Sequence, residues 1–423
     1  MHKMTKNPQR LIALLISLLF LAGCVKGDPV SENAAVMVEN ETAITVFQGS
    51  TEAQRVKIPE TIRFTHIGLE EGLSQSTVHS MVQDSQGFMW FGTEDGLNRF
   101  DGYGFKIYRP DSADPNSLSD RWITALAADA DGNLWVGTRQ GGLNFYDSVS
   151  GKFTRYSHDE EVSGSLAGNQ IQTIYIDSLE RVWVGTQAGL DLYSKETSTF
   201  IHYLPVADGN GDSLANSITA INEDSEGNLW IGSASAGLFM FDPEAVEFTN
   251  YRRDQNSRYS LTSDSIRGIQ NGGEGILWVA TDNGLNMFRP KTGIFVQYKH
   301  NVTNSRSLAA NYIQTMLVDG AGNLWVGTDE GLDRFNPIGE TFVHYTNDPG
   351  DSKSLKTNMV EALFESCDGI LWVGTFGGSL NKYDRAMDNF RYFSHDPEDP
   401  DSIAGNIIRS EEHTSELQSR ITI

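Results

Sequence analysis

The sequence has little of what marks disulfide-rich, nucleic-acid-binding or membrane-spanning proteins. Only two cysteines, Cys24 and Cys367, occur in 423 residues, so a disulfide framework is not expected. The 32 basic residues are outnumbered by 56 acidic ones, and the formal charge of -24 argues against nucleic acid or anionic lipid as the main partner. The apolar stretch from Leu11 to Leu21 is shorter than the roughly 20 residues that a comfortable membrane span needs.

Residues 1–24 have the pattern of a lipoprotein-type signal segment. Basic residues precede the apolar stretch, which ends in Leu21-Ala22-Gly23-Cys24, so Cys24 is the predicted lipidation site. An ordinary cleaved signal or a tight anchor is the alternative. Residues 25–60 are polar, irregular and acidic, and we expect a flexible tether there. These features predict an exported protein on the periplasmic or cell-surface side, attached to a membrane through its N-terminal anchor.

Tryptophan recurs at a nearly fixed spacing over the remaining chain. Seven tryptophans are separated by 45, 48, 47, 48, 47 and 47 residues, and most lie in variants of Leu-Trp-Val-Gly-Thr followed by Gly-Leu. They are Trp90, Trp135, Trp183, Trp230, Trp278, Trp325 and Trp372. A period of roughly 40 to 50 residues with glycine-rich turns is typical of propeller blades rather than helical solenoids.

Each repeat contains four predicted strands. In the second repeat these are residues 123–128, the tryptophan strand, residues 143–147 and residues 153–156, with a tight turn at 129–132. The predicted fold class is all-β, a seven-bladed β-propeller of four-stranded antiparallel blades over residues 61–393. Helix is expected to be nearly absent from this region.

The fourth-strand pattern occurs eight times, although only seven tryptophan repeats exist. The surplus copy surrounds Phe64, before the first repeat, and Phe390 begins the last copy. We therefore predict closure by strand exchange, in which residues near Phe64 supply the outer strand of the seventh blade. Residues 394–409 open a further repeat, and residues 410–423 have an unrelated, non-native-looking composition. A genuine disordered C-terminus is the alternative for this tail.

The repeated positions have structural interpretations. A tryptophan present in every blade is expected to pack one blade against the next, because a single blade cannot bury its own apolar face. A ring of tryptophans that stacks on a ligand is the weaker alternative. Aspartates in the first turn of five repeats are expected to cap the hairpins, since their loops lack the ligand density of a calcium site. These aspartates are Asp84, Asp129, Asp177, Asp224 and Asp319.

The chain resembles the two-component regulator propeller repeats. The resemblance rests on the seven Trp-containing signatures, on residues 68–74 (GLEEGLS) and on residues 95–102 (DGLNRFDG). It implies the periplasmic sensor region of a receptor whose cytoplasmic part is a histidine kinase, a hybrid kinase or a diguanylate cyclase. It also implies an oligosaccharide or other small-molecule ligand, and a homodimer of the full-length receptor. No output module follows here, and the tail resembles translated sequencing adapter, so we expect a truncated version of a longer receptor.

Two rival functions stay open at this point, a surface scaffold that binds another protein and a propeller glycosidase or lyase. No acid, base or metal ligand set breaks the repeat, so we predict no catalytic residues, no metal and no cofactor. Five histidines lie on or just after the fourth strands and are expected to be exposed on the outer rim, pointing apart. They are His158, His202, His300, His344 and His395.

Candidate ligand residues come from the positions at which the repeats disagree. Thirteen residues before each tryptophan stand Thr77, Trp122, Gln170, Ser217, Ser265, Tyr312 and Met359. Eleven residues before it stand His79, Thr124, Gln172, Thr219, Arg267, Gln314 and Glu361. The residue between these rows is always Val or Ile. Because the first strand lies nearest the propeller axis, we expect the variable side chains to surround the mouth of the central channel. The predicted ligand-binding residues are His79, Trp122, Gln172, Arg267, Tyr312, Gln314 and Glu361, and ordinary solvated channel residues are the alternative.

Overall fold

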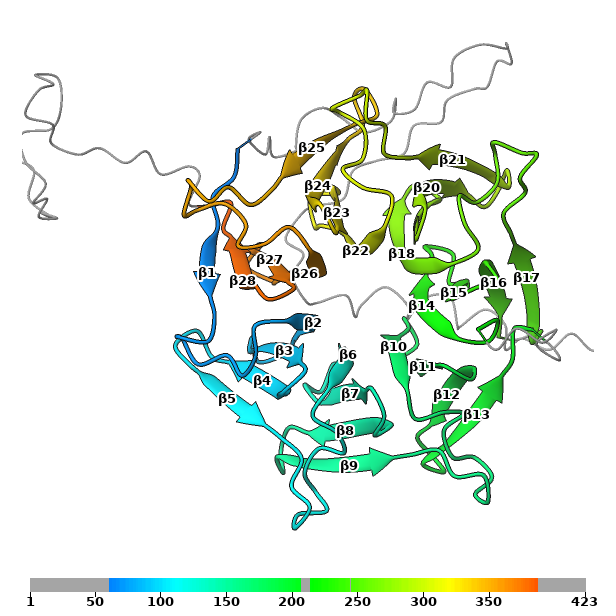
Figure 1. The fold of residues 1–423 in the computed structure, drawn as a ribbon. Helices are drawn as coiled ribbons and strands as arrows, with labels where there is room; N and C mark the ends of the chain where they lie inside the picture. Colours follow the sequence, from blue (N-terminus) through cyan, green and yellow to red (C-terminus); the bar gives the residue numbers. More distant parts are fainter. Residues whose placement is uncertain (1–60, 207–213, 244, 387–423) are drawn as a thin grey trace, which may run out of the picture.

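The computed structural model describes residues 61–206, 214–243 and 245–386. The secondary structure elements within these ranges are all β-strands. They form seven four-stranded antiparallel sheets around a central axis (Figure 1). The predicted all-β, seven-bladed propeller is therefore confirmed. None of the described residues forms a helix with the length and apolarity to span a membrane. Residues 1–60 and 387–423, which include Cys24, His395, Phe390 and the predicted further repeat and tail, lie outside the described residues.

Each blade runs from an inner first strand to an outer fourth strand (Figure 1). The first strands are β2 (Val78–Gln83), β6 (Ile123–Ala128), β10 (Ile171–Ile176), β14 (Ile218–Glu223), β18 (Ile266–Gly273), β22 (Ile313–Val318) and β26 (Val360–Glu365). The second strands are β3 (Met89–Thr93), β7 (Leu134–Thr138), β11 (Val182–Thr186), β15 (Leu229–Ser233), β19 (Ile276–Thr281), β23 (Leu324–Thr328) and β27 (Leu371–Thr375). The third strands are β4 (Gly96–Phe100), β8 (Leu143–Asp147), β12 (Leu190–Ser194), β16 (Leu238–Asp242), β20 (Gly284–Arg289), β24 (Gly331–Asn336) and β28 (Ser379–Tyr383). The fourth strands are β5 (Phe105–Tyr108), β9 (Lys152–Tyr156), β13 (Thr199–Tyr203), β17 (Glu247–Tyr251), β21 (Ile294–Tyr298), β25 (Thr341–Tyr345) and β1 (Thr65–Ile67).

The ring closes through β1, which completes the seventh blade from the opposite end of the described chain. Thr65 pairs with Lys382 and Ile67 with Leu380 in an antiparallel register. Phe64 is 2% exposed and its ring lies 6.3 Å from that of Tyr383. The predicted strand exchange is confirmed, and β1 covers the outer edge of β28, so the seventh blade has four strands like the others.

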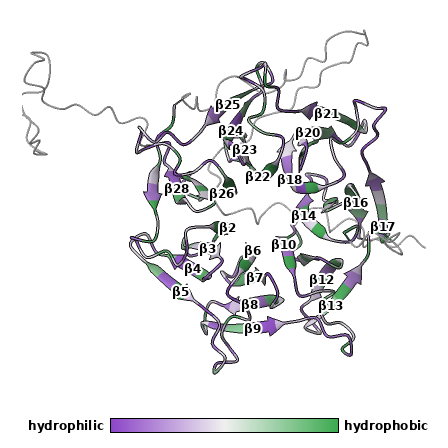
Figure 2. Cartoon of the chain, in the orientation of Figure 1, coloured by the Kyte–Doolittle hydropathy of each residue, from purple (hydrophilic) through white to green (hydrophobic). Residues whose placement is uncertain are grey.

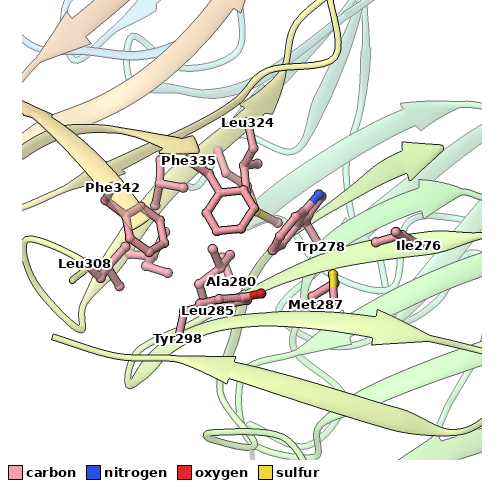
Figure 3. Packing of buried hydrophobic residues seen from close by; sticks show 13 residues of the cluster. Ile276, Trp278, Ala280, Leu285, Met287, Tyr298, Leu308, Leu324, Phe335 and Phe342 are labelled. Carbon is pink, nitrogen blue, oxygen red and sulfur yellow. The ribbon is translucent and has the colours of Figure 1, made fainter. Parts of the chain in front are cut away.

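The blade tryptophans pack against the following blade, as predicted. Trp278 lies 5.1 Å from Phe335 of the sixth blade, and both belong to a buried cluster with Phe342 and Leu308 (Figure 3). All seven tryptophans are at most 5% exposed. Figure 2 shows hydrophilic residues along the loops and outer strands, with hydrophobic residues gathered inside the blades. The core is therefore a series of interfaces between blades, rather than one central cluster.

The glycine of the Trp-Val-Gly motif allows the closest approach between blades. A Cβ placed on Gly137 would lie 2.5 Å from Ile171 Cγ2, and one on Gly232 would lie 2.5 Å from Ile266 Cγ2. Both isoleucines belong to the first strand of the next blade and are fully buried. The inner ring thus depends on a β-branched side chain that packs directly on a glycine backbone.

The fifth blade solves the same packing problem in reverse. Ala280 replaces the motif glycine, and its cross-strand partner is Gly268. The corresponding partner of Gly232 in the fourth blade is Ala220. Each of these two cross-strand pairs therefore carries one methyl group. It lies on the first strand in the fourth blade and on the second strand in the fifth blade.

The turn aspartates cap hairpins and also hold the tryptophans. Asp84 Oδ1 accepts the backbone N–H groups of Gln86 and Phe88, at 3.0 Å each, and its Oδ2 accepts Trp90 Nε1 at 2.7 Å. Asp177, Asp224 and Asp319 bind their own tryptophans in the same way, at 2.7 to 2.8 Å. The predicted capping role is confirmed, and the bond to the indole adds a second function to the same carboxylate.

Replacing a motif glycine should destabilise the ring. Gly232→Ala places a methyl group against Ile266, and we expect the free energy of unfolding to fall by about 1–3 kcal/mol through overpacking. Adding Ala220→Gly should recover part of this loss, because the double variant reproduces the pair of the fifth blade. Urea denaturation of both variants and the wild type measures the effect. Equal unfolding free energies for Gly232→Ala and wild type would contradict the packing argument.

Candidate ligand-binding ring

The variable side chains occupy bulges at the start of the seven inner strands. In every blade the pairing of the first and second strands shifts register around one residue, for example between Val78 and Ser80 or between Ile266 and Gly268. The residues at these shifts are His79, Thr124, Gln172, Thr219, Arg267, Gln314 and Glu361. An extra residue in a strand is released from the regular ladder and can vary without breaking it. We call these seven residues the bulge row.

The apolar residue before each bulge has the opposite role. All seven of these side chains are fully buried between blades. They are Val78, Ile123, Ile171, Ile218, Ile266, Ile313 and Val360. The prediction that the fold requires this middle row is confirmed.

A third variable row lies beside the other two and escaped the sequence analysis. It is the residue four positions after each tryptophan, at the turn between the second and third strands. In five blades its N–H donates to the carbonyl of the residue thirteen before the tryptophan, as from Arg139 to Trp122 at 3.0 Å and from Phe376 to Met359 at 2.9 Å. The row consists of Glu94, Arg139, Gln187, Ala234, Asp282, Asp329 and Phe376. The signal available in the sequence was the variability of this position directly after a Gly-Thr pair that five of the seven blades share.

One group of predicted residues meets across the seventh, first and second blades. His79 Nε2 lies 3.4 Å from Glu94 Oε1, and His79 Nδ1 lies 3.8 Å from Glu361 Oε2. The imidazole stacks on Trp122, with ring centroids 6.0 Å apart and planes within 16°. These three side chains are 18 to 29% exposed, so the group is half-buried, with one imidazole between two carboxylates.

The geometry of Trp122 modifies the prediction that its face stacks on a sugar. The guanidinium carbon of Arg139 lies 3.9 Å from the centroid of the indole, in addition to the stacked His79 ring. Such cation–π contacts are favourable, so the indole is already partly engaged. A ligand that stacks on Trp122 must share it with, or displace, one of these two side chains.

A second group forms between the fifth and sixth blades. An Arg267 terminal nitrogen donates to Gln314 Oε1 at 2.9 Å, and the guanidinium carbon lies 5.2 Å from the ring centroid of Tyr312. Tyr312 is 38% exposed. The structure therefore brings together three predicted residues from neighbouring inner strands.

Other bulge residues connect blades to one another. Thr124 and Thr219 donate to the carbonyls of Ile171 and Ile266, at 2.7 Å each. Gln172, a predicted ligand residue, donates to Ser217 Oγ at 2.6 Å and stands apart from both charged groups. These bonds occupy part of the polar capacity that the prediction assigned to a ligand, and ligand contact by all seven candidates stays a prediction.

The outer-rim histidines are engaged more closely than expected. His202 and His344 bind the buried carboxylates of Asp191 and Asp333, at 2.6 Å each. His158 and His300 contact the carbonyls of Leu166 and Leu308 in the connecting loops. His202 lies exposed on the rim, as predicted, whereas the side chain of His344 is only 29% exposed. Each imidazole also contacts a carboxylate that is fully shielded from solvent.

The partner of these histidines differs between blades in a consistent way. Asp191 and Asp333 accept a loop N–H through the second carboxylate oxygen, from Ala167 and Ala309. Four other blades have asparagine at this position and accept an equivalent loop N–H. These are Asn98, Asn144, Asn286 and Asn381. The buried group thus fixes the loop that enters each of these six blades. A histidine stands opposite both aspartates, at His202 and His344, and His66 stands opposite Asn381 of the seventh blade.

Cavities occur over these connecting loops as well as near the ring. One of about 650 Å³ is lined by the loop from His300 to Asn311 and reaches Asp329 of the third row. A second, of about 360 Å³, lies over the preceding loop beside Arg253 and Lys299. In the described part of the chain, no group of three or more His, Cys, Asp or Glu side chains is arranged to hold a metal ion.

Part of the repeat pattern matches a known protein family. Five segments match the profile of the two-component regulator propeller, at residues 72–95, 117–140, 165–188, 212–235 and 307–330. The chain thus carries two-component regulator propeller repeats, which confirms the family resemblance. The fifth and seventh blades, outside these matches, have Gly272 and Ser366 in place of the turn aspartate.

Solved structures with the same fold include receptor domains. The extracellular domain of a protein described as a hybrid two-component system from B. thetaiotaomicron aligns with a TM-score of 0.65 and 24% identity, over 77% of this chain and 42% of that one. A second such domain from that organism aligns with a TM-score of 0.62 and 21% identity, over 79% of this chain and 40% of that one. PorZ is a surface component of the type-IX secretion system of Porphyromonas gingivalis. It aligns with a TM-score of 0.56 and 17% identity, over 74% of this chain and 47% of that one.

A curated relative, histidine kinase P4 of Formosa agariphila, is 55% identical over 49 residues, which is 12% of this chain and 4% of the kinase. The chain therefore spans less than half of the length of each of these proteins.

The pair of Asp333 and His344 predicts a pH dependence of stability. Its hydrogen bond to Asp333 raises the pKa of His344 above 6.5. Protonated His344 therefore adds stability that is complete below about pH 6.5 and is lost as the pH rises through the higher folded-state pKa. His344→Gln leaves Asp333 buried without its cation and should cost about 1–3 kcal/mol at pH 6.

The fifth blade supplies the matched control, because Asn286 there stands opposite Gln297. Asp333→Asn combined with His344→Gln should restore most of the stability and flatten this part of the pH profile. Thermal unfolding of all three proteins from pH 5.5 to 8.5 provides the measurement. A wild type whose pH profile matches that of the double variant would refute the assignment.

Proposed function

We propose that this chain is the extracytoplasmic ligand-binding part of a bacterial signal-transduction receptor, with an oligosaccharide as its ligand. The observation that carries the proposal is the ring of bulge residues, where one fold position holds five different residue types across the seven blades. A ring that served only the fold would repeat, as the buried middle row does. The extracellular domains of similar fold support a sensor role.

The ring offers the chemistry that saccharide recognition uses. Aromatic side chains present flat apolar faces to sugar rings, and amide, carboxylate and guanidinium groups bond to hydroxyls. The aromatic faces come from Trp122, Tyr312 and Phe376, of which Phe376 is 51% exposed. Gln314 and Glu361 are among the hydrogen-bonding groups. Signal transfer to a kinase or cyclase outside this chain, and a receptor homodimer, belong to the same proposal. The propeller itself is assigned no catalytic role.

A surface scaffold that binds another protein is the second candidate, supported by the fold shared with PorZ. A thermal-shift screen against oligosaccharides separates the two functions, because only the sensor should be stabilised by a free saccharide. A hydrolysis assay on the same oligosaccharides tests the less favoured glycosidase or lyase.

Trp122→Ala should weaken binding of the oligosaccharide that gives the largest thermal shift by at least about tenfold, the loss expected for one aromatic contact. The melting temperature without ligand should change little, because Trp122 is only half-buried. Tyr103→Ala, at a 98% exposed residue of an outer turn, is the control and should bind normally. Isothermal titration calorimetry measures the affinities. Normal binding by Trp122→Ala would exclude the indole from the site.

Membrane attachment through Cys24 is part of the same proposal. In cells fed an alkyne-labelled fatty acid, the wild-type protein should incorporate the label and sediment with membranes. Cys24→Ser should abolish both, whereas Cys367→Ser should change neither, because Cys367 lies on a turn of the seventh blade. A wild-type protein that is exported without label would count against lipidation.

A further inference from the structure

The inner ring is uneven in charge compensation. Where the seventh and first blades meet, the neighbouring bulge residues are Glu361 and His79, and Glu94 lies on the other side of the imidazole. Where the fifth and sixth blades meet, the neighbouring bulge residues are Arg267 and Gln314. The same structural junction therefore holds a carboxylate beside an imidazole at one place and a cation beside a neutral amide at the other.

Arg267 lacks the partner that several other arginines in this structure possess. Arg109, Arg181 and Arg252 each bind a carboxylate, at 2.5 to 3.0 Å. Among the described residues no ion pair to Arg267 exists, and its buried Nε donor has no hydrogen-bond partner. A buried N–H donor without an acceptor costs free energy, and a ligand that supplies the acceptor removes that cost.

The surroundings of Arg267 also suit a ligand rather than bulk solvent alone. Tyr312 lies beside the guanidinium and exposes 38% of its surface, which offers an aromatic face next to a cation. Gln314 holds one terminal nitrogen at 2.9 Å and so orients the planar fork. A planar guanidinium that is held in place by one bond binds carboxylate or sulfate oxygens through its remaining donors.

We propose that Arg267, Tyr312 and Gln314 form a subsite for an anionic substituent, so that the ligand is an acidic oligosaccharide. This inference rests on the proposed saccharide-binding function and specifies its substrate class. The shared chemistry is a tetrahedral or planar oxyanion, supplied either by a uronate carboxylate or by a sulfate ester. The protein's charge of -24 repels anions at long range, so selection for such a ligand requires direct contact with a local cation of this kind.

A glycan array probed with the full chain tests the ligand class. It should carry uronate-containing and sulfated oligosaccharides together with their carboxyl-reduced and desulfated counterparts. We expect binding to an acidic form that exceeds binding to its neutral counterpart by about 10- to 100-fold, the range for a hydrogen bond to a charged group. The uronate and sulfate arms identify which anion is preferred.

Two variants connect this preference to the subsite. Arg267→Gln should lower the affinity for the preferred acidic glycan to that of its neutral counterpart, as measured by calorimetry. Gln314→Glu keeps Arg267 but gives it an internal carboxylate, and it should also reduce acidic binding by at least about tenfold. Arg155→Gln is the control, since Arg155 lies on the outer strand β9 away from the inner ring, and it should retain the preference for the acidic form.

The possible outcomes separate this inference from the proposed function. Binding of neutral and acidic forms with equal affinity, or an acidic preference that survives Arg267→Gln, overturns the anionic subsite while the saccharide sensor stands. Binding of no glycan on the array overturns the saccharide function and the subsite with it. Unchanged thermal unfolding of Arg267→Gln confirms that a loss of binding arises at the subsite and not from misfolding.

Discussion

The contact of a β-branched side chain with a glycine backbone between neighbouring blades is the constraint on which the rest of the structure depends. Ile171 on Gly137 and Ile266 on Gly232 leave no room for even one methyl group. The fifth blade meets the constraint with Ala280 opposite Gly268. Because each contact joins one blade to the next, the ring closes only when all seven are satisfied, and β1 joins the two ends of the described chain.

The bulge next to this contact separates structural from functional requirements within two residues. Ile266 is fully buried between blades, whereas Arg267 immediately after it is released from the strand ladder. The fold therefore restricts one side chain and leaves the next open to variation, seven times around the axis. Such an arrangement lets the side chains around the axis vary while the buried packing beneath them stays the same.

Electrostatic compensation follows two different patterns in this acidic protein. The buried carboxylate of Asp333 bonds to a histidine, and the half-buried Glu361 faces the imidazole of His79 across the ring. Arg267 departs from this pattern because its neighbour is an amide. Unmatched groups in an otherwise compensated structure are the positions where an external partner contributes most, since the protein itself leaves their donors unused.

The sequence by itself determined the fold, because the tryptophan period and the alternation of strands and tight turns depend on local spacing. It also determined the bulge row and the strand exchange near Phe64, which follow from comparing and counting repeats. Only the tertiary structure decided which of these side chains meet. His79 and Glu361 are 282 positions apart in sequence and 3.8 Å apart in space, because ring closure brings the first and seventh blades together. The contact of Arg139 with Trp122 and the missing partner of Arg267 likewise depend on side-chain directions, which the repeat period does not encode.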